Sequence, residues 1–434
     1  MFIINTYFTF NYSAVINILF VINPRLHRGL FTFNHFVILT SYSYTPSVKT
    51  LTFPLYAILK SLISCIFLIF DLTNQSISLN MSSIIRGTGS ALAERTIPNA
   101  FFLNNTFYDK NGVKNEKDNQ DIIAKLEAIT GIRERRYIPD NQSSVPLMAE
   151  AAKNALTSAN INRNDLDGII LAHNSGNMLP NESAFHPIPN MAALLKNALE
   201  MTNHHCFAYD LLFGCPGWLQ GLIQAHQTIQ CGDAENILVV GLEIASRMMD
   251  PHDLDSMIFA DGCGACVLSR SSNPDEGIQS YATFSHAEKD LMNIHLGKSN
   301  NPSVSGNTFC KMTGKDVYRY ATTWVPQVIK KALDKKNLSI QDIDLFLLHQ
   351  ANEKMLSAIA TSLGALYGIN LSWFDHKIPM TIDFLGNTSV ATIPTMLDLI
   401  MKNQLNGYSI QKGQRVVLSS VGAGMHCNAI VYQF

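Results

Sequence analysis

The sequence predicts an α/β protein made of two similar halves, and three observations support this prediction. Helical and strand-like patterns alternate from Met81 to the end of the chain, as they do in layered α/β folds. Two long stretches resemble each other in composition and order, and each ends in a histidine. The chain has 434 residues, 47% of them hydrophobic, which is enough for two cores of ordinary size. We therefore expect one half at about 81–272 and a second at 273–434, packed back to back on one core.

The repeat follows the same order in both halves. In the first, an Ala-Leu pair, an Asn and an Asp-Leu-Asp motif lead into the apolar run 168–172 and then His173. In the second, an Ala-Leu pair, an Asn and an Asp-Ile-Asp motif lie at one constant offset from the first and lead into the run 345–348 and then His349, which is one residue out of this offset. Short apolar runs of this kind are typical of buried strands. A duplicated α/β unit explains the correspondence.

Further strands are expected around the repeat. Ile84 and Ile85, followed by Gly-Thr-Gly at 87–89, predict an opening strand and turn. Segments 236–240 and 415–419 are strand-like, and each precedes a turn that contains glycine. The last two segments therefore hold equivalent places in the two halves.

A cysteine between a strand and a helix is the most informative residue of the chain. The strand-like stretch 207–214 ends at a glycine, Cys215 follows, and Pro216 opens a helical pattern. Proline is favoured at the start of a helix because its missing N–H would have no partner there. Free N–H groups and the helix dipole favour a thiolate at such a point. An isolated cysteine is more often a structural residue, but this setting favours a nucleophile.

Two more polar residues stand at comparable turns. His349 begins a His-Gln-Ala-Asn run after the strand 345–348, and a helix with an apolar face follows. Asn387 lies in a Gly-Asn-Thr-Ser run that we interpret as a strand-to-helix turn, the counterpart of the Cys215 turn. Alone, such a histidine is usually structural, and asparagine favours turns and helix caps in any case. Pseudo-twofold packing of the halves would bring the three turns together, at strand ends where α/β folds bind ligands.

A thiol, an imidazole and an amide around one site suit acyl transfer. The cysteine would take an acyl group from a thioester. His349 and Asn387 would donate hydrogen bonds to the carbonyl of a second thioester as negative charge develops on it. Neutral donors suit an enolate formed by loss of CO₂, because no proton has to be removed from carbon.

Composition argues against several other classes. With 32 basic and 34 acidic residues the net charge is −2, which argues against a nucleic-acid-binding protein. Eight irregularly spaced cysteines do not form a disulfide scaffold and indicate a reducing compartment, so we expect the cytoplasm. Cys263 and Cys266 have CxxC spacing without a second pair, so a packed strand is favoured over a zinc or redox site. No phosphate-binding glycine motif is present, and Gly422-Ala-Gly424 is interpreted as a turn after a strand.

Residues 1–80 differ from the rest of the chain. They are rich in Phe, Ile, Tyr, Ser and Asn, and they contain only one acidic residue, Asp71. The stretch 51–70 has the length of a membrane span but contains Pro54 and Lys60, and a central lysine costs on the order of 3 kcal/mol for insertion. A membrane tether, a targeting presequence and a start assigned upstream of the true one compete. We favour a dispensable leader over a tether.

Eight short motifs occur in a fixed order along the chain, and the whole set is highly specific for one family. They are the Gly-Thr-Gly-Ser of 87–90, the Thr-Gly-Ile-Arg-Glu-Arg of 130–135, Cys215, the Phe-Ala-Asp-Gly of 259–262, the Met-Thr-Gly-Lys-Asp-Val of 312–317, the His-Gln-Ala-Asn of 349–352, the Gly-Asn-Thr-Ser of 386–389 and the Gly-Ala-Gly of 422–424. With this set, the chain from about Met81 to Phe434 resembles the β-ketoacyl-acyl-carrier-protein synthase III family of condensing enzymes. The resemblance implies a thiolase-like fold in αβαβα layers.

The resemblance also implies a role for each residue. Cys215 would be acylated by an acyl-CoA or other acyl thioester, and His349 and Asn387 would promote decarboxylation of malonyl-acyl carrier protein. The enolate would attack the Cys215 thioester and give a 3-oxoacyl product. The backbone N–H groups of Cys215 and Ala423 would form the oxyanion hole, and Lys354 and Asn352 are weaker candidates for carrier or substrate contact. The family implies a homodimer without metal or redox cofactor, with acyl carrier protein as a partner.

Several positions depart from the family pattern. Lys125 and Ile129 stand where members usually place a Trp and an Arg, respectively, that hold the CoA adenine. Ala423 replaces a usual glycine but keeps its N–H, and Pro216 and Trp218 follow the nucleophile where smaller residues are common, which indicates a reshaped acyl pocket. These departures favour a specialised branch, such as one making alkylresorcinol or polyketide-like products.

Two alternatives stay open at this point. The same fold could transfer an acyl group to an oxygen or nitrogen acceptor without release of CO₂. Alternatively, the chain could be a non-catalytic partner subunit of a condensing enzyme. This second alternative is disfavoured because the chain keeps Cys215, His349 and Asn387.

Overall fold

The computed structural model describes residues 2–10, 14–22, 82–180 and 185–434. Contacts within the chain divide it into two units, Met1–Leu79 and Asn80–Phe434. In the first unit, β1 (Phe2–Phe10) pairs antiparallel with β2 (Ala14–Ile22). The candidate span 51–70 lies outside the described residues. None of the helices described is both long enough and apolar enough to cross a membrane.

The first sheet of the second unit has the strand order β3-β9-β8-β6-β7. β6 is parallel to β7 and β8, whereas β9 is antiparallel to β8 and β3. The apolar runs predicted to be strands are strands here, because their residues are buried on both faces. The bounds of these strands are β3 Ser82–Leu92, β6 Gly168–Ala172, β7 Phe207–Leu211, β8 Asn236–Ile244 and β9 Asp261–Ser271.

The second sheet repeats this arrangement with one strand fewer, in the order β10-β15-β14-β13. β13 is parallel to β14, as β6 is to β8, and the other pairs are antiparallel. The bounds of these strands are β10 Gly277–Ser285, β13 Leu345–Leu348, β14 Arg415–Gly422 and β15 His426–Gln433.

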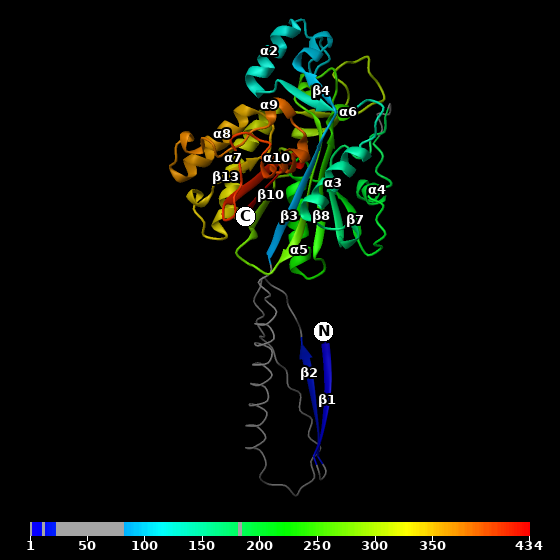
Figure 1. The fold of residues 1–434 in the computed structure, drawn as a ribbon, viewed down its shortest axis with the longest axis vertical. Coiled ribbons are helices and arrows are strands. Elements are labelled where there is room, and N and C mark those ends of the chain that lie inside the picture. Colours follow the sequence, from blue (N-terminus) through cyan, green and yellow to red (C-terminus); the bar gives the residue numbers. More distant parts are fainter. Residues whose placement is uncertain (1, 11–13, 23–81, 181–184) are drawn as a thin grey trace. The chain divides into compact units, whose positions relative to one another are not determined.

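Helices and sheets alternate in five layers (Figure 1). One face of the first sheet packs on α3 (Val145–Ala159) and α4 (Met191–Ala198). The facing sides of both sheets enclose α5 (Gly217–Gln230) and α10 (Thr392–Met401). The outer face of the second sheet packs on α7 (Gly314–Asp334) and α8 (Glu353–Tyr367). The expected αβαβα layering of two similar halves is confirmed.

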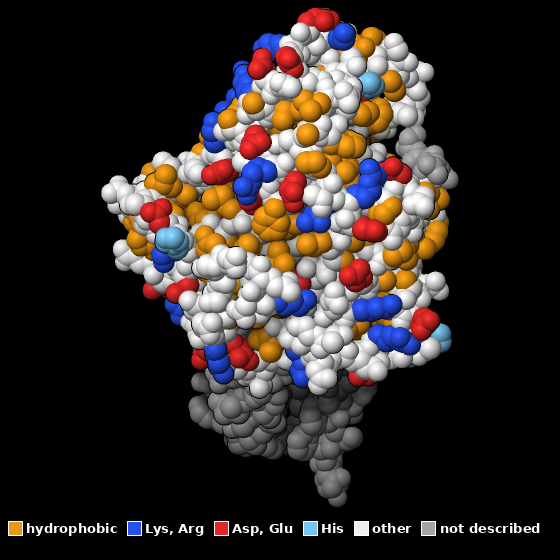
Figure 2. Space-filling view, turned by 45° about the horizontal axis from the view of Figure 1, so that its top comes forward, with side chains coloured by type: hydrophobic (Ala, Val, Ile, Leu, Met, Phe, Trp, Pro, Cys, Tyr) orange, Lys and Arg blue, Asp and Glu red, His pale blue; other side chains and the backbone are white. Residues whose placement is uncertain are grey.

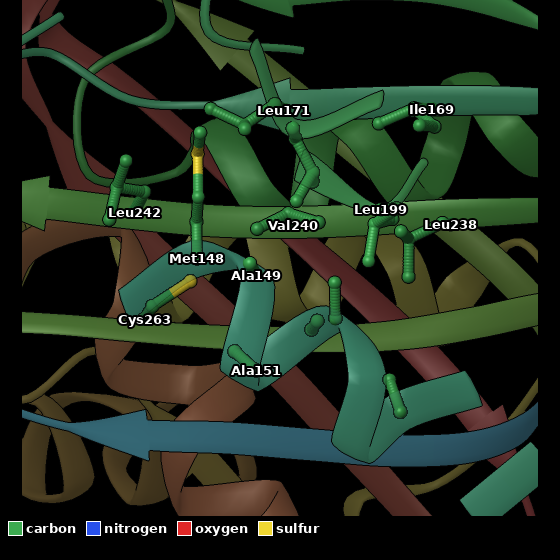
Figure 3. Packing of buried hydrophobic residues seen from close by; sticks show 14 of the residues in the cluster. Met148, Ala149, Ala151, Ile169, Leu171, Leu199, Leu238, Val240, Leu242 and Cys263 are labelled. Atoms are coloured by element: carbon green, nitrogen blue, oxygen red, sulfur yellow. The ribbon is translucent and has the colours of Figure 1, made fainter. Parts of the chain in front are cut away.

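Alternation along the strands assigns side chains to these layers. Ile169 and Leu171 of β6 belong to the outer α3 core, whereas Ile170 between them belongs to the central core. Figure 3 shows the outer core, where Met148 of α3 lies among Leu171, Leu242 and other apolar side chains of the sheet. Each sheet therefore contributes to two cores, which fixes the register of every strand.

Cys263 and Cys266 lie in β9 as free, fully buried thiols, one on each face of the sheet. The predicted packed strand is thus confirmed at this place. The other free cysteines among the described residues are Cys206, Cys215, Cys231, Cys310 and Cys427.

The central helix α10 ties the halves together through a buried carboxylate. Asp398 of α10 accepts hydrogen bonds from Thr88 Oγ1 at 2.8 Å and Ser90 Oγ at 2.6 Å, both on β3. Lys402 donates to the same carboxylate at 2.9 Å. A buried carboxylate with this many donors is well satisfied, so it fixes the sheet and the helix to each other.

Two local predictions are wrong. The glycines at 87–89 do not form a turn but lie inside β3, because α3 crosses so closely that a Cβ on Gly87 or Gly89 would overlap the backbone of Ala159 or Ala155. The segment before Asn387 is a short helix, α9 (Ile382–Leu385), and not a strand.

Local contacts explain why the segment before Asn387 is not a strand. Gly386, with φ of +68°, ends α9 in a conformation that glycine adopts without strain. Arg133 binds the segment twice, through its N–H to the carbonyl oxygen of Asp383 and through an ion pair with the Asp383 carboxylate. The segment is therefore held by neighbouring loops rather than by a sheet edge.

Smaller elements complete the second unit. β4 pairs antiparallel with β5, and β11 with β12. Their bounds, with those of two further helices, are β4 Arg95–Pro98, α2 Asn119–Thr130, β5 Glu134–Tyr137, α6 Ala245–Met248, β11 Ile294–Gly297 and β12 Phe309–Met312. The face shown in Figure 2 mixes basic and acidic side chains without a block of one sign, in line with the small net charge.

Candidate active site

Cys215 lies between β7 and α5, as the sequence predicts, with Pro216 as the N-cap of the helix. Gly214 before it has φ of +63°, and a Cβ there would meet the backbone of Ala423. A Cβ on Gly422 would in turn meet the backbone nitrogen of Cys215. Only glycine fits this close approach. The turns that carry the two predicted oxyanion-hole nitrogens, those of Cys215 and Ala423, therefore touch through their backbones.

One cavity of about 200 Å³ is lined by Cys215, His349, Asn387 and Ala423 together. The structure thus brings the three side chains and the second oxyanion-hole residue to one place. Its remaining lining is mostly apolar and includes Met248, Phe259, Ile294, Leu296, Cys310 and Met312. The hairpin β11–β12 supplies most of these apolar residues. An apolar cavity with a few convergent polar groups is the usual form of a ligand site.

The weaker candidates lie elsewhere. Asn352 Oδ1 accepts a hydrogen bond from the backbone N–H of Met355 at 2.7 Å, so its side chain caps α8. Lys354 is exposed on the first turn of the same helix. Neither is among the residues that line the cavity. The predicted contact of Lys354 or Asn352 with a carrier or substrate stays a prediction.

Trp218 does not reshape the acyl pocket. Its side chain is fully buried in the central core, and its indole N–H donates to the carbonyl oxygen of Val239 at 3.2 Å. It faces the sheet rather than the cavity, because it lies on the apolar side of α5 that packs in the central core.

The thiol of Cys215 is not a resting thiolate, contrary to the expectation from its place at a helix start. Burial raises the pKa of Cys215 to about 12, and the nearby charge of Glu243 acts in the same direction. A hydrogen bond from the Ser389 hydroxyl, at 3.2 Å from Sγ, lowers this pKa but does not offset burial. Desolvation therefore outweighs the helix terminus, so a base must take the thiol proton during reaction.

Ser389 is a functional candidate that the sequence analysis missed. Its φ is +50°, which is unfavourable for a residue with a Cβ, and its side chain is buried. Besides donating to the sulfur, its hydroxyl lies 3.3 Å from Asn174 Nδ2, which in turn donates to Glu243 at 2.8 Å. Its place in the Gly-Asn-Thr-Ser motif was a signal, but its contact with the sulfur depends on tertiary packing.

Asn387 is oriented by its neighbours. Its Oδ1 accepts a hydrogen bond from the backbone N–H of Ser389 at 2.8 Å. Its own backbone is paired with the strand start at Ile258 and Ala260. Because Oδ1 is occupied in this way, the amide Nδ2 is the group that can donate to a ligand in the cavity.

His349 is buried, and burial lowers its pKa to about 4, so the ring is neutral at pH 7. Its Nδ1 lies 2.8 Å from Thr392 Oγ1 on α10. The repeat equivalent, His173, has a different role: its Nε2 lies 2.9 Å from the carboxylate of Asp210, which receives the N–H groups at the start of α4. Duplication therefore preserved the position of the histidine but only one copy reaches the cavity.

In the part of the chain that the structure describes, no group of three or more His, Cys, Asp or Glu side chains is placed to hold a metal ion.

Comparisons with known proteins find one recurring family. Residues 209–287 match the family model of 3-oxoacyl-[acyl-carrier-protein] synthase III, and residues 333–434 match the model of its C-terminal part. The chain is 38% identical over 317 residues to β-ketoacyl-[acyl-carrier-protein] synthase III of Porphyra purpurea, covering 70% of this chain and 89% of the relative. It is 31% identical over 356 residues to β-ketoacyl-[acyl-carrier-protein] synthase III 1 of Vibrio vulnificus strain YJ016, covering 82% of this chain and all of the relative.

Solved structures are similar as well. The synthase III of Thermus thermophilus superposes with a TM-score of 0.64 at 27% identity and covers 81% of this chain and 99% of its own.

Proposed function

We propose, from the premise that this chain belongs to the β-ketoacyl-[acyl-carrier-protein] synthase III family, that it catalyses a decarboxylative Claisen condensation. An acyl thioester acylates Cys215, and malonyl-acyl carrier protein then extends the acyl group to a 3-oxoacyl product. The product would enter fatty acid or polyketide-like lipid biosynthesis. The observation that carries the proposal is the single apolar cavity lined by Cys215, His349 and Asn387.

Acylation begins with a neutral thiol. Cys215 loses its proton to a base, and its sulfur attacks the carbonyl carbon of the acyl thioester. The backbone N–H groups of Cys215 and Ala423 would stabilise the oxyanion, since their turns are in contact. The carbon–sulfur bond to the donor breaks, and the leaving thiolate takes up the proton.

Condensation uses the amide of Asn387 as its hydrogen-bond donor. Loss of CO₂ from the malonyl thioester leaves an enolate, and Asn387 Nδ2 is free to donate to its oxygen. The enolate carbon attacks the Cys215 thioester, a carbon–carbon bond forms, and the carbon–sulfur bond to Cys215 breaks. The sulfur then takes up one proton, which restores the thiol. These steps require neither a metal nor an organic cofactor.

The proposed substrates follow from the size and surroundings of the cavity. Its volume of about 200 Å³ suits a short acyl chain. Gly131 at the end of α2 packs against Glu353 at the start of α8, so the exposed Lys125 and Lys354 lie on neighbouring helices. Basic side chains there suit an acidic acyl carrier protein. We further expect a homodimer, which light scattering on the purified chain would test.

Intact mass spectrometry after incubation with acyl thioesters of graded length tests the proposal. The wild-type chain should gain the mass of one acyl group, mapped to Cys215. Cys215→Ala should lose the adduct and reduce condensation by at least about a thousandfold while the fold is kept. Cys231→Ala, which changes an exposed thiol, is the matched control and should keep both. Full activity of Cys215→Ala would refute the proposal, and absence of any adduct would favour a non-catalytic subunit.

Acyl transfer to an oxygen or nitrogen acceptor is the second candidate. It needs Cys215 but no decarboxylation. Release of CO₂ from a malonyl thioester, lost in His349→Ala and in Asn387→Ala, would exclude it. Acyl transfer to an alcohol or amine without CO₂ release would establish it instead.

A further inference from the structure

A short hydrogen-bonded chain joins the imidazole of His349 to Thr392 and Ser389. His349 Nδ1 is 2.8 Å from Thr392 Oγ1, and the Thr392 hydroxyl donates to the backbone carbonyl oxygen of Ser389 at 3.0 Å. All three residues are buried. Thr392 is the first residue of α10, and its hydroxyl therefore links the catalytic histidine to the residue that contacts the nucleophile.

A count of hydrogens favours one tautomer of the His349 ring. A threonine hydroxyl has one hydrogen, and here it is donated to the Ser389 carbonyl. The hydroxyl oxygen can then only accept from His349, so Nδ1 carries the hydrogen of the neutral imidazole. Rotating the hydroxyl toward Nδ1 would give the other tautomer, but with one hydrogen bond fewer: the Ser389 carbonyl oxygen would keep the backbone N–H of Thr392 and lose only the hydroxyl.

We propose that Thr392 is a positioning residue that holds His349 in the Nδ1–H tautomer and so makes Nε2 the base for Cys215. In acylation, Nε2 takes the proton from the Cys215 sulfur and the ring becomes an imidazolium. The sulfur bonds to the acyl carbon, the carbon–sulfur bond of the donor breaks, and the leaving thiolate takes the proton back from Nε2. The inference rests on the proposed role of Cys215 but adds the residue that prepares its base.

Other groups near the sulfur are poorly placed for this task. Ser389 donates its hydroxyl hydrogen to the sulfur, and Asn387 Oδ1 is occupied by a backbone N–H. The Glu243 carboxylate receives hydrogen bonds from Asn174 and Ser175 and is fully buried. His295 also lines the cavity, from β11, and is the competing base that the test must address.

Alkylation of Cys215 by iodoacetamide, followed by peptide mass spectrometry, measures thiol deprotonation without any thioester. Thr392→Val keeps the shape of the side chain but removes the hydroxyl, and we expect about tenfold slower alkylation at pH 7. Thr392→Ser should retain the wild-type rate. The matched control is Thr395→Val on the same helix, where the buried hydroxyl has no hydrogen-bond partner, and its rate should not change.

A wild-type rate in Thr392→Val would overturn the proposal, and so would a loss caused by His295→Ala instead. The alkylation rate does not depend on condensation, so it tests the role of Thr392 even if the chain is inactive with every thioester. Failure of the proposed function would appear as a missing acyl adduct with normal alkylation.

Nitrogen-15 spectra of the histidine rings give a second readout that needs no variant of Thr392. The wild-type His349 resonances, assigned by their absence from His349→Gln, should show a protonated Nδ1 and an unprotonated Nε2. Thr392→Val should shift the ring toward the Nε2–H tautomer. A wild-type ring protonated at Nε2 would refute the proposal, even if Thr392→Val does not fold.

Discussion

At the scale of single residues, the active site is governed by desolvation. Cys215 stands where a helix begins, and His349 stands at the end of a strand, yet both are held in their neutral forms by burial. A neutral thiol beside a neutral imidazole avoids the cost of a buried charge pair at rest. Charge then develops only when a substrate carbonyl is present to receive it.

These pKa values predict a pH dependence. Because the pKa of Cys215 is about 12, alkylation of this thiol in His349→Ala, which lacks the proposed base, should become faster with rising pH throughout pH 6–9, without a plateau near neutrality. Because the pKa of His349 is about 4, its base form is lost only as pH falls toward 4, so it should impose no limb on acylation between pH 5 and 7. Alkylation rates followed by peptide mass spectrometry, with exposed Cys231 as an internal reference, check the first expectation. A plateau at pH 7 would contradict it.

Ser389 provides a second prediction at this scale. Ser389→Ala removes the hydroxyl that donates to Cys215 Sγ, a bond that stabilises developing negative charge by about 1 kcal/mol. Acylation should become about fivefold slower, as measured by the rate of mass gain. Ser420→Ala is the matched control, since the Ser420 hydroxyl is buried without a hydrogen-bond partner. Equal rates in Ser389→Ala and wild type would show that the bond is not used.

At the scale of elements, prediction from sequence succeeded where the local pattern was long or strongly apolar. The run at β13 and the apolar face of α8 are examples, because their burial leaves few alternatives. α9 escaped prediction because a four-residue helix has almost no periodic signal and is held by Arg133 from the distant loop between α2 and β5. The backbone of Ser389 and its contact with the sulfur escaped for the same reason, since both depend on packing between the halves.

The glycines of β3 allow a test of one such packing contact. Gly89→Ala would place a methyl group against the backbone of α3 at Ala155, and overpacking of this kind typically costs about 1–3 kcal/mol. The midpoint of thermal unfolding should fall accordingly. Gly314→Ala, at the start of α7 with open space around the added methyl group, should be neutral or slightly stabilising. Equal stability of the two variants would contradict the close approach of α3 to β3.

At the scale of the whole molecule, the repeat was sufficient to predict two halves and the layers they form. The positions of His173 and His349 showed the duplication, but only the structure shows which copy lines the cavity. The sequence repeat thus identified equivalent histidine positions but not their different roles, because each role depends on which residues pack against that position.

A chain that begins at Met81 should contain everything that the chemistry requires. The second unit comprises Asn80–Phe434 and contains every residue of the cavity. We expect such a chain to fold and to gain the same acyl mass at Cys215 as the full chain, at a similar rate. Its circular dichroism spectrum and thermal midpoint provide the control for folding. A folded but inactive truncated chain would show that the first unit contributes to activity.

The central position of α10 has a consequence for how the enzyme fails. This helix carries Thr392 beside the histidine at one end and Asp398, bonded to β3, further along. It contacts β3, β9 and β13, so it cannot shift unless both sheets separate. Heating should therefore leave catalysis intact until the native fold itself collapses, and the temperatures of inactivation and of cooperative melting should coincide.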